Sequence, residues 1–298
     1  MHWRPGLNPK QNRLQDLTDD QLLGIVRGIE KESLRTRPNG ELATTAHALA
    51  LGSALTHASI TTDFSESQLE LITGVHATAQ GAIDELTQVH QYVHRAIGDE
   101  LMWAGSMPGD LPADALIPIG QYGSSNVGRA KTVYRTGLSH RYGRRMQTIS
   151  GIHYNWSMPG VTSEQYFALI RNFRRQAFLV LYLFGASPAV SESFLSDHPH
   201  ALQPLGEHSL HLPHATSLRM GRLGYQSDAQ TALCVSYNCL DSYAASLHGA
   251  LTNAYPDYER LGIRNADGEY QQLATSLLQI ENEFYSTIRP KRVVRSGE

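Results

Sequence analysis

The chain has 298 residues, of which 25 are basic and 28 acidic, so its formal net charge at pH 7 is −3. This balance excludes the strong positive field that draws proteins to nucleic acid or to anionic membranes. With 41% hydrophobic residues the chain is able to bury a substantial core. No linker rich in proline, glycine or serine divides it, and we expect a single domain over residues 1–298.

The two cysteines and the apolar runs predict where the protein resides. Cys234 and Cys239 match neither a Cys-x-x-Cys redox motif nor a zinc pair, which indicates free thiols in a reducing compartment. The N-terminus lacks the apolar core of a secretory signal, and the longest apolar run, residues 178–184, is too short to cross a bilayer. We therefore expect a cytoplasmic protein without a membrane partner.

The first predicted elements are a short helix and an extended segment. Residues 18–21 read Thr-Asp-Asp-Gln and resemble a capping box, which predicts a helix running toward Arg27. If the following stretch is extended, Glu30 and Glu32 point to one side and Lys31 to the other. Two carboxylates this close are costly unless water, a base or a metal ion compensates them. Water is the usual answer for an isolated pair, so residues further along must decide.

The rest of the chain alternates between helical and extended patterns. Alternation over residues 67–73 predicts a strand with Leu69 and Leu71 facing away from Glu70. Apolar spacing and capping signals predict helices over residues 83–97, 129–146, 163–184 and 227–254. Because the alternation is not a regular strand–helix series, we expect an α+β fold with a largely antiparallel sheet.

The strand predicted over residues 148–158 adds a histidine to the carboxylates. Strand parity allows its polar face to join those of the two other extended segments; the side chains concerned are Glu30, Glu32, Asp63, Glu70, His153 and Asn155. Alternatives are open for each: a solvated strand face for the acids, a turn for Asp63 and a core position for His153. Several acids that converge are costly without a cation, and hard oxygen ligands suit Mg²⁺ or Mn²⁺ better than zinc. Such a site predicts phosphoryl transfer from a nucleotide.

Eight stretches carry a resemblance to a known family: Gly-Ile-Glu-Lys-Glu-Ser-Leu-Arg at 28–35, Leu-Gly-Ser-Ala-Leu-Thr-His at 51–57, Ile-Thr-Thr-Asp-Phe at 60–64, Gln-Thr-Ile-Ser-Gly-Ile-His-Tyr-Asn at 147–155, Tyr-Leu-Phe-Gly-Ala-Ser-Pro at 182–188, Ala-Thr-Ser-Leu-Arg at 215–219, Gln-Ile-Glu-Asn-Glu-Phe-Tyr at 279–285 and Ile-Arg-Pro-Lys-Arg at 288–292. From about Leu23 onward the chain resembles the proteobacterial type of glutamate–cysteine ligase. That ATP-dependent enzyme begins glutathione synthesis.

The resemblance implies a glutamine-synthetase-like fold, in which a curved, largely antiparallel sheet has helices packed outside it. It also implies four sets of site residues. They are Mg²⁺ ligands at Glu30, Glu32, Asp63, Glu70 and His153; a glutamate pocket at Gln147, Ile149, Asn155 and Arg219; a cysteine pocket at Tyr134, Tyr225 and Tyr285; and nucleotide phosphate contacts at Arg289, Lys291 and Arg292. The basic run at the end of the chain is otherwise read as a solvated tail.

The implied reaction is ligation of the L-glutamate γ-carboxylate to the amine of L-cysteine, through an acyl phosphate made from ATP. Family members continue beyond the last residue here with a Tyr-Ile-Glu-x-Arg strand that supplies another metal-binding carboxylate. We therefore expect the N-terminal part of a ligase, incomplete in its sheet, which a second polypeptide completes if the natural chain ends at Glu298. The alternatives are a truncated, non-catalytic or regulatory relative, a ligase that joins glutamate to another amine, and a metal-dependent hydrolase.

Overall fold

The computed structural model describes residues 17–195, 200–224, 228–231 and 233–291. Within them the main sheet has five strands, and β1 pairs with β3 along one edge and with β4 and β5 along the other. The strands are β1 (Val26–Thr36), β2 (Ile60–Thr62), β3 (Gln68–Ile72), β4 (Leu101–Met102) and β5 (Ile152–Ser157). Every neighbouring pair is antiparallel, which confirms the predicted α+β class.

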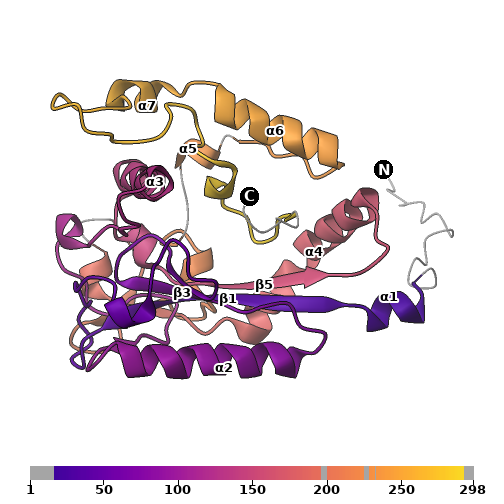
Figure 1. Ribbon diagram of the computed structural model, residues 1–298, viewed down its shortest axis with the longest axis horizontal. Coiled ribbons are helices and arrows are strands. Elements are labelled where there is room, and N and C mark those ends of the chain that lie inside the picture. Colours follow the sequence, from indigo (N-terminus) through magenta and orange to yellow (C-terminus); the bar gives the residue numbers. More distant parts are fainter. Residues whose placement is uncertain (1–16, 196–199, 225–227, 232, 292–298) are drawn as a thin grey trace.

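One face of the sheet is covered by α2 (Ala79–Ala96), which follows β3 in the chain and runs beside β1 (Figure 1). Its first turn is capped by the Thr78 hydroxyl, which accepts a hydrogen bond from the Gly81 amide. Leu69 and Leu71 are 0% exposed and share a cluster with Val93 of this helix. A shift of β3 by one residue would bury Glu70 in that cluster, so hydrophobic packing fixes the polar residues on the opposite face.

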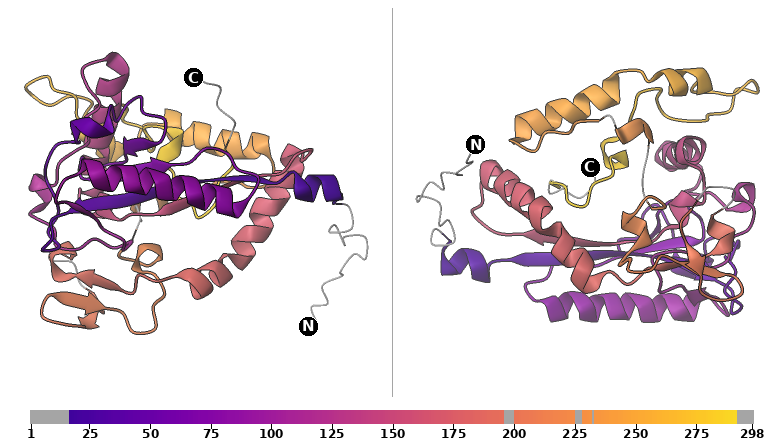
Figure 2. Two further views of the ribbon diagram at one scale, coloured as in Figure 1. Left: turned by 60° about the horizontal axis from the view of Figure 1, so that its bottom comes forward. Right: turned by 180° about the vertical axis from the view of Figure 1, so that it is seen from behind.

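The side of the sheet away from α2 faces α3 (Asn126–Tyr142) and the C-terminal helices, as the front and back views show (Figures 1 and 2). Those helices are α5 (Asp228–Thr231), α6 (Leu240–Thr252) and α7 (Pro256–Leu261). After β5 the chain enters α4 (Ser163–Phe184), in which Phe167 and Ile170 share a hydrophobic cluster with Leu247 of α6. Apolar contacts thus hold α4 against α6.

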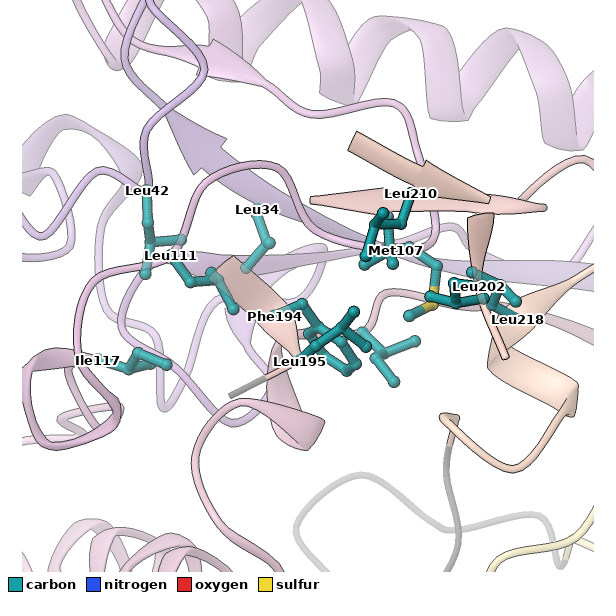
Figure 3. Packing of buried hydrophobic residues seen from close by; sticks show 12 residues of the cluster. Leu34, Leu42, Met107, Leu111, Ile117, Phe194, Leu195, Leu202, Leu210 and Leu218 are labelled. Carbon is teal, nitrogen blue, oxygen red and sulfur yellow. The ribbon is translucent and has the colours of Figure 1, made fainter. Parts of the chain in front are cut away.

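A second, smaller sheet packs near the end of β1. Its strands are β6 (Ala189–Ser191), β7 (Gln203–Pro204) and β8 (Ser209–His211), in the order β6–β8–β7. Leu210 of β8 lies in one cluster with Leu34 of β1 and with Met107 and Leu111 from the intervening loop (Figure 3). Leu34 lies on the same side of β1 as Glu30 and Glu32, because alternate strand residues share a side. The apolar cluster therefore covers this side of the strand next to the carboxylates.

Single turns of 3₁₀ helix and one short α-helix complete the described elements. The 3₁₀ turns are Leu49–Leu51, Asp114–Leu116, Met146–Thr148, Glu192–Phe194, Leu218–Met220 and Glu281–Glu283. The predicted capping box at Thr18 is present, but α1 (Asp19–Leu23) ends before Arg27 because Gly24 caps it and β1 begins at Val26. No helix of the described residues is both long and apolar enough to cross a membrane.

The predicted helix over residues 227–254 is wrong in its middle. α5 ends at Thr231 and α6 begins only at Leu240, so the described residues between them are not helical. Here the Ser236 hydroxyl donates to that of Ser242, whose oxygen also accepts from the Cys239 amide. Such side chains compete with the helical hydrogen-bond ladder and favour a cap at this point.

Two further boundaries differ from expectation for local reasons. The helix expected over 129–146 is α3, which begins earlier, where Ser125 caps it, and ends at Tyr142, where Gly143 adopts a φ of 79°. The strand expected over 148–158 is shorter, because a 3₁₀ turn extends to Thr148 and β5 begins at Ile152. The helix expected over 163–184 is present as α4 with those bounds.

Candidate functional site on the main sheet

The polar face of the main sheet brings the predicted carboxylates together. Glu32 lies directly opposite Glu70 across the β1–β3 pair, and Glu30 lies opposite His153 across the β1–β5 pair. Residues directly opposite in an antiparallel pair point to the same side of the sheet. The shared face predicted from strand parity is therefore present. It includes Asn155, which pairs with Gly28 one step further along.

Glu30 is the most strongly paired of these acids. One of its oxygens accepts hydrogen bonds from Asn155 (2.9 Å) and from the Lys291 ammonium (2.6 Å), and the other lies 3.1 Å from His153 Nδ1. Burial alone would raise the pKa of this carboxyl. The hydrogen bonds from His153, Lys291 and Asn155 and the charge of Lys291 outweigh it and lower the pKa to about 2.

Glu32 and Glu70 are in the opposite electrostatic state. Burial raises the pKa of Glu32 well above its ordinary value, Asp63 and Glu70 add to the effect, and Arg219 and the Gly151 amide oppose it. Burial, with Asp63 and Glu30, raises the pKa of Glu70 to about 8. Close, buried like charges are costly when all are ionised, and a bound cation would offset that cost.

A divalent cation fits the donor atoms present. Glu30, Glu70 and His153 each offer one ligand atom, and these atoms lie within 4.8 Å of one another. The two carboxylates suit Mg²⁺ or Mn²⁺, which prefer oxygen ligands, and the imidazole adds a nitrogen donor to the set. Asp63 follows β2, and its charge acts on both Glu32 and Glu70. The role of these residues, with Glu32, as metal ligands stays a prediction.

The residues expected to bind glutamate border the acids. The Arg219 guanidinium lies 3.9 Å from a Glu32 oxygen and donates to the Ile149 carbonyl at 3.3 Å. It comes so close to Gly151 that a Cβ at that position would lie 2.5 Å from Arg219 Nη2. Gly151 also donates its amide to Glu32 at 2.6 Å. This glycine therefore lets the arginine and the carboxylate approach one another.

Gln147 and Asn155 have their amide groups engaged within the protein. The Gln147 amide donates to the Tyr285 hydroxyl at 3.0 Å, and the Asn155 amide donates to Glu30. The Ile149 side chain is fully buried in the cluster under β1. Of the four residues predicted to bind glutamate, Asn155 and Arg219 thus lie next to the carboxylates, whereas Gln147 contacts Tyr285 and the Ile149 side chain packs in the apolar core.

The predicted cysteine pocket is described in part. Burial and the nearby Glu283 raise the pKa of Tyr134 in α3. The neighbouring phenol of Tyr285 adds to this effect. Tyr225 lies outside the described residues. Of the residues predicted to meet phosphates, Arg289 donates to the Asn282 carbonyl, Lys291 binds Glu30, and Arg292 lies outside the described residues. Lys291 therefore contacts the site by donating a hydrogen bond to the Glu30 carboxylate.

Two basic residues near the acids were missed from the sequence. Arg135 donates from Nε to the Asp63 carbonyl at 2.6 Å, and its guanidinium lies 5.2 Å and 5.0 Å from the ring centres of Tyr122 and Tyr134. One helical turn earlier, the Lys131 ammonium lies 5.2 Å from the Tyr122 ring centre. Their four-residue spacing beside Tyr134 on an expected helix was a usable signal, because such residues share one helix face.

An antiparallel sheet that carries a carboxylate cluster, with helices on both sides, defines an α+β protein with an acidic site on its sheet. Residues 12–298 match the glutamate–cysteine ligase family model. A glutamate–cysteine ligase from Alcanivorax borkumensis is 52% identical over 299 residues, covering 93% of this chain and 57% of that protein. The chain belongs to the glutamate–cysteine ligase family.

Two solved structures have similar folds. A glutamate–cysteine ligase from Francisella tularensis in complex with AMP aligns with a TM-score of 0.87 and 42% identity, covering 92% of this chain and 57% of that chain. A bifunctional glutathione synthetase from Pasteurella multocida aligns with a TM-score of 0.68 and 28% identity, covering 91% of this chain and 33% of that one. The chain thus spans a little over half the length of the curated relatives it matches.

Proposed function

We propose that this chain carries the metal and glutamate sites of an ATP-dependent ligase that joins the L-glutamate γ-carboxylate to the amine of L-cysteine. The observation that carries the proposal is the cluster of Glu30, Glu32 and Glu70 on one sheet face, beside Arg219. Family membership supports it, since relatives that are about half identical over this chain bear that name. The AMP bound to the Francisella relative supports a nucleotide as co-substrate.

Glu30, Glu32, Asp63, Glu70 and His153 would hold Mg²⁺ or Mn²⁺. The cation would neutralise the charge that develops on the transferred phosphoryl group. The lowered pKa of Glu30 keeps this carboxylate ionised and ready to bind the cation. Because the pKa of Glu70 is raised, this carboxyl must lose a proton when the cation binds. Lys131 and Arg135 place further positive charge beside Glu70 and Asp63, where it favours an approaching phosphate.

The glutamate substrate would lie next to these acids. Arg219, with a planar fork of donors, would bind its α-carboxylate, and Gln147, Ile149 and Asn155 would form the rest of the pocket. ATP would phosphorylate the γ-carboxylate and leave as ADP. The cysteine amine would attack the acyl carbon, release phosphate and lose a proton, in a pocket lined by Tyr134, Tyr225 and Tyr285. No protein nucleophile is needed for either step.

We further propose that more polypeptide covers one side of this chain in the active protein, whether in the same chain or in a second one. Toward the end of α4, six large apolar side chains are exposed: Phe178, Leu179, Val180, Tyr182, Leu183 and Phe184. On neighbouring β5, Ile152 and Tyr154 are also exposed, and in the described residues this strand pairs only with β1. Large apolar patches and open strand edges are typical of surfaces that another segment covers.

The test is acceptor-dependent product formation. The chain is assayed together with the C-terminal part of a relative that it does not cover. The two should convert glutamate, cysteine and MgATP to γ-glutamylcysteine and ADP in equal amounts. Competition with other small amines distinguishes a cysteine ligase from a ligase for another amine. Equal use of several amines would contradict the cysteine assignment. Metal-dependent ATP hydrolysis unaffected by glutamate would contradict the ligase reaction itself.

A further inference from the structure

A fully buried ion pair joins α3 to the C-terminal segment. Arg141 Nη1 lies 3.0 Å from Glu283 Oε1, and both side chains are 0% exposed. The same carboxylate oxygen accepts from the Tyr142 hydroxyl at 2.6 Å, and the second oxygen accepts from the backbone N–H of Gln279 at 2.6 Å. Each oxygen of this buried carboxylate is therefore satisfied, which is the condition under which a buried charge is tolerated.

Arg141 spreads its remaining donors over the segment that leads to Glu283. It donates to the Gln272 side chain and to the carbonyls of Ala274 and Leu277, and its guanidinium lies 4.0 Å from the Tyr258 ring centre. The segment approaches α3 so closely that a Cβ at Gly137 would lie 2.2 Å from Gln279 Oε1. Residues 272–283 are therefore fixed against one face of α3.

The pair continues directly into the predicted substrate pockets. The Tyr285 amide donates to Gln230 Oε1, and the Gln230 amide donates to the Tyr142 hydroxyl and the Glu283 carbonyl. The rings of Tyr142 and Tyr285 meet edge to face, with centres 5.8 Å apart. The Tyr285 hydroxyl then accepts the 3.0 Å hydrogen bond from Gln147, in the segment whose Gly151 binds Glu32.

We propose that Glu283 and Arg141 are positioning residues: their ion pair fixes Tyr285 and, through its hydroxyl, Gln147, so that the pockets for the acceptor amino acid and for glutamate keep one relative geometry. The inference rests on the proposed function, because it assigns those pockets to the two amino acids. Apolar residues would hold the segments together equally well, but hydrogen bonds and ion pairs are directional, so this network favours one relative orientation of α3 and the C-terminal segment. Neither Arg141 nor Glu283 is among the residues predicted to line the substrate pockets.

Glu283→Gln is the first test, because it removes the charge and keeps the shape. Hydrogen exchange of the backbone amides of residues 147–151 should become about tenfold faster, since local opening there costs less when Tyr285 is loosened. Glu100→Gln is the matched control. It breaks another ion pair, in which Arg35 is buried and Glu100 is partly exposed, because Glu100 bonds to Arg35 and Thr45. It should leave exchange at 147–151 unchanged.

Tyr285→Phe tests the second link and keeps the proposal falsifiable if Glu283→Gln does not fold. It leaves the ion pair and the ring contact in place and removes only the hydroxyl that binds Gln147. The positioning role predicts the same faster exchange at residues 147–151. If both variants exchange at the wild-type rate in this segment, the proposal is overturned.

Substrate affinity supplies the functional readout, with L-cysteine and L-glutamate titrated separately in the presence of Mg²⁺ and a non-hydrolysable ATP analogue. Glu283→Gln should weaken cysteine binding about tenfold more than Glu100→Gln does, with a smaller loss for glutamate. If Glu283→Gln and Glu100→Gln weaken cysteine and glutamate binding to the same extent, the ion pair contributes only to overall stability. That result would contradict the proposal. Wild-type protein that binds neither amino acid would contradict the proposed function, and hydrogen exchange would then decide the positioning role alone.

Discussion

Glu32 and Glu70 lie directly opposite one another on β1 and β3, and the pKa of each carboxyl is raised. The neighbouring Glu30 has its pKa lowered to about 2, because hydrogen bonds from His153, Lys291 and Asn155 outweigh the effect of burial. One face of one sheet thus holds acids in opposite protonation states. A cation bound there would favour the ionised form of all three, which makes metal and proton binding competitive.

Without metal, the stability of the fold should depend on pH through Glu70. The Glu70 pKa rises from 4.5 in the unfolded chain to about 8 in the fold, so between these pH values the folded state binds a proton that the unfolded state releases. The free energy of unfolding due to Glu70 therefore falls as pH rises through this window. Denaturant titrations should show a shallower fall for Glu70→Gln, and identical slopes would contradict the raised pKa.

Metal binding should stabilise the fold at a pH where ionisation of Glu70 destabilises it. Added Mg²⁺ or Mn²⁺ should raise the melting temperature at pH 8, because a ligand at 100 times its Kd stabilises a fold by about 2.7 kcal/mol. Glu70→Gln should lose most of this gain. Glu85→Gln serves as the control, since Glu85 pairs with His76 at the surface. A gain of the same size in the Glu70 variant would place the ion elsewhere.

Lys291 should compete with the metal ion for Glu30. Its ammonium lies 2.6 Å from a Glu30 oxygen and is partly exposed to solvent. Lys291→Met should therefore tighten Mg²⁺ binding in the absence of nucleotide by about two- to fivefold, which is the range of an exposed ion pair. Calorimetric titration measures this directly. Weaker binding in the variant would show that Lys291 supports the metal site.

Gly151→Ala should impair glutamate binding more than it impairs folding. The new methyl group would lie 2.5 Å from Arg219 Nη2, and the flexible end of the arginine side chain would move away to accommodate it. Affinity for L-glutamate should fall about tenfold, as expected when a positioned donor is displaced. Gly221→Ala is the matched control, because its Cβ would make only ordinary contacts, the nearest at 3.5 Å. Equal affinities in the two variants would remove Arg219 from the pocket.

The strands that carry the site were predictable because strand parity is a local rule. Alternation alone placed Glu30 with Glu32 and His153 with Asn155, and the observed register brings both pairs to one face. Element ends were less predictable. The non-helical residues before α6 depend on the hydroxyls of Ser236 and Ser242, which a helical pattern does not reveal.

Contacts between distant segments were the part that sequence patterns did not reveal. Glu283 pairs with Arg141, and Lys291 with Glu30, although nothing in the neighbouring residues marks either pairing. Each depends on how the C-terminal segment folds back over the sheet and α3. Lys291 was associated with phosphates through the family resemblance, whereas its bond to a carboxylate became visible only with the tertiary fold.

The most direct test of the ligase assignment is γ-glutamylcysteine formation by wild-type protein and by Glu32→Gln, each assayed with the polypeptide that completes the family's length. Wild-type protein should form the dipeptide and ADP in equal amounts. Glu32→Gln should lower turnover at least about 100-fold, as for loss of a preorganised charge at the reacting centre, with an unchanged circular dichroism spectrum. Equal turnover in a folded Glu32→Gln variant would contradict the role of Glu32 in a metal-assisted ligase site.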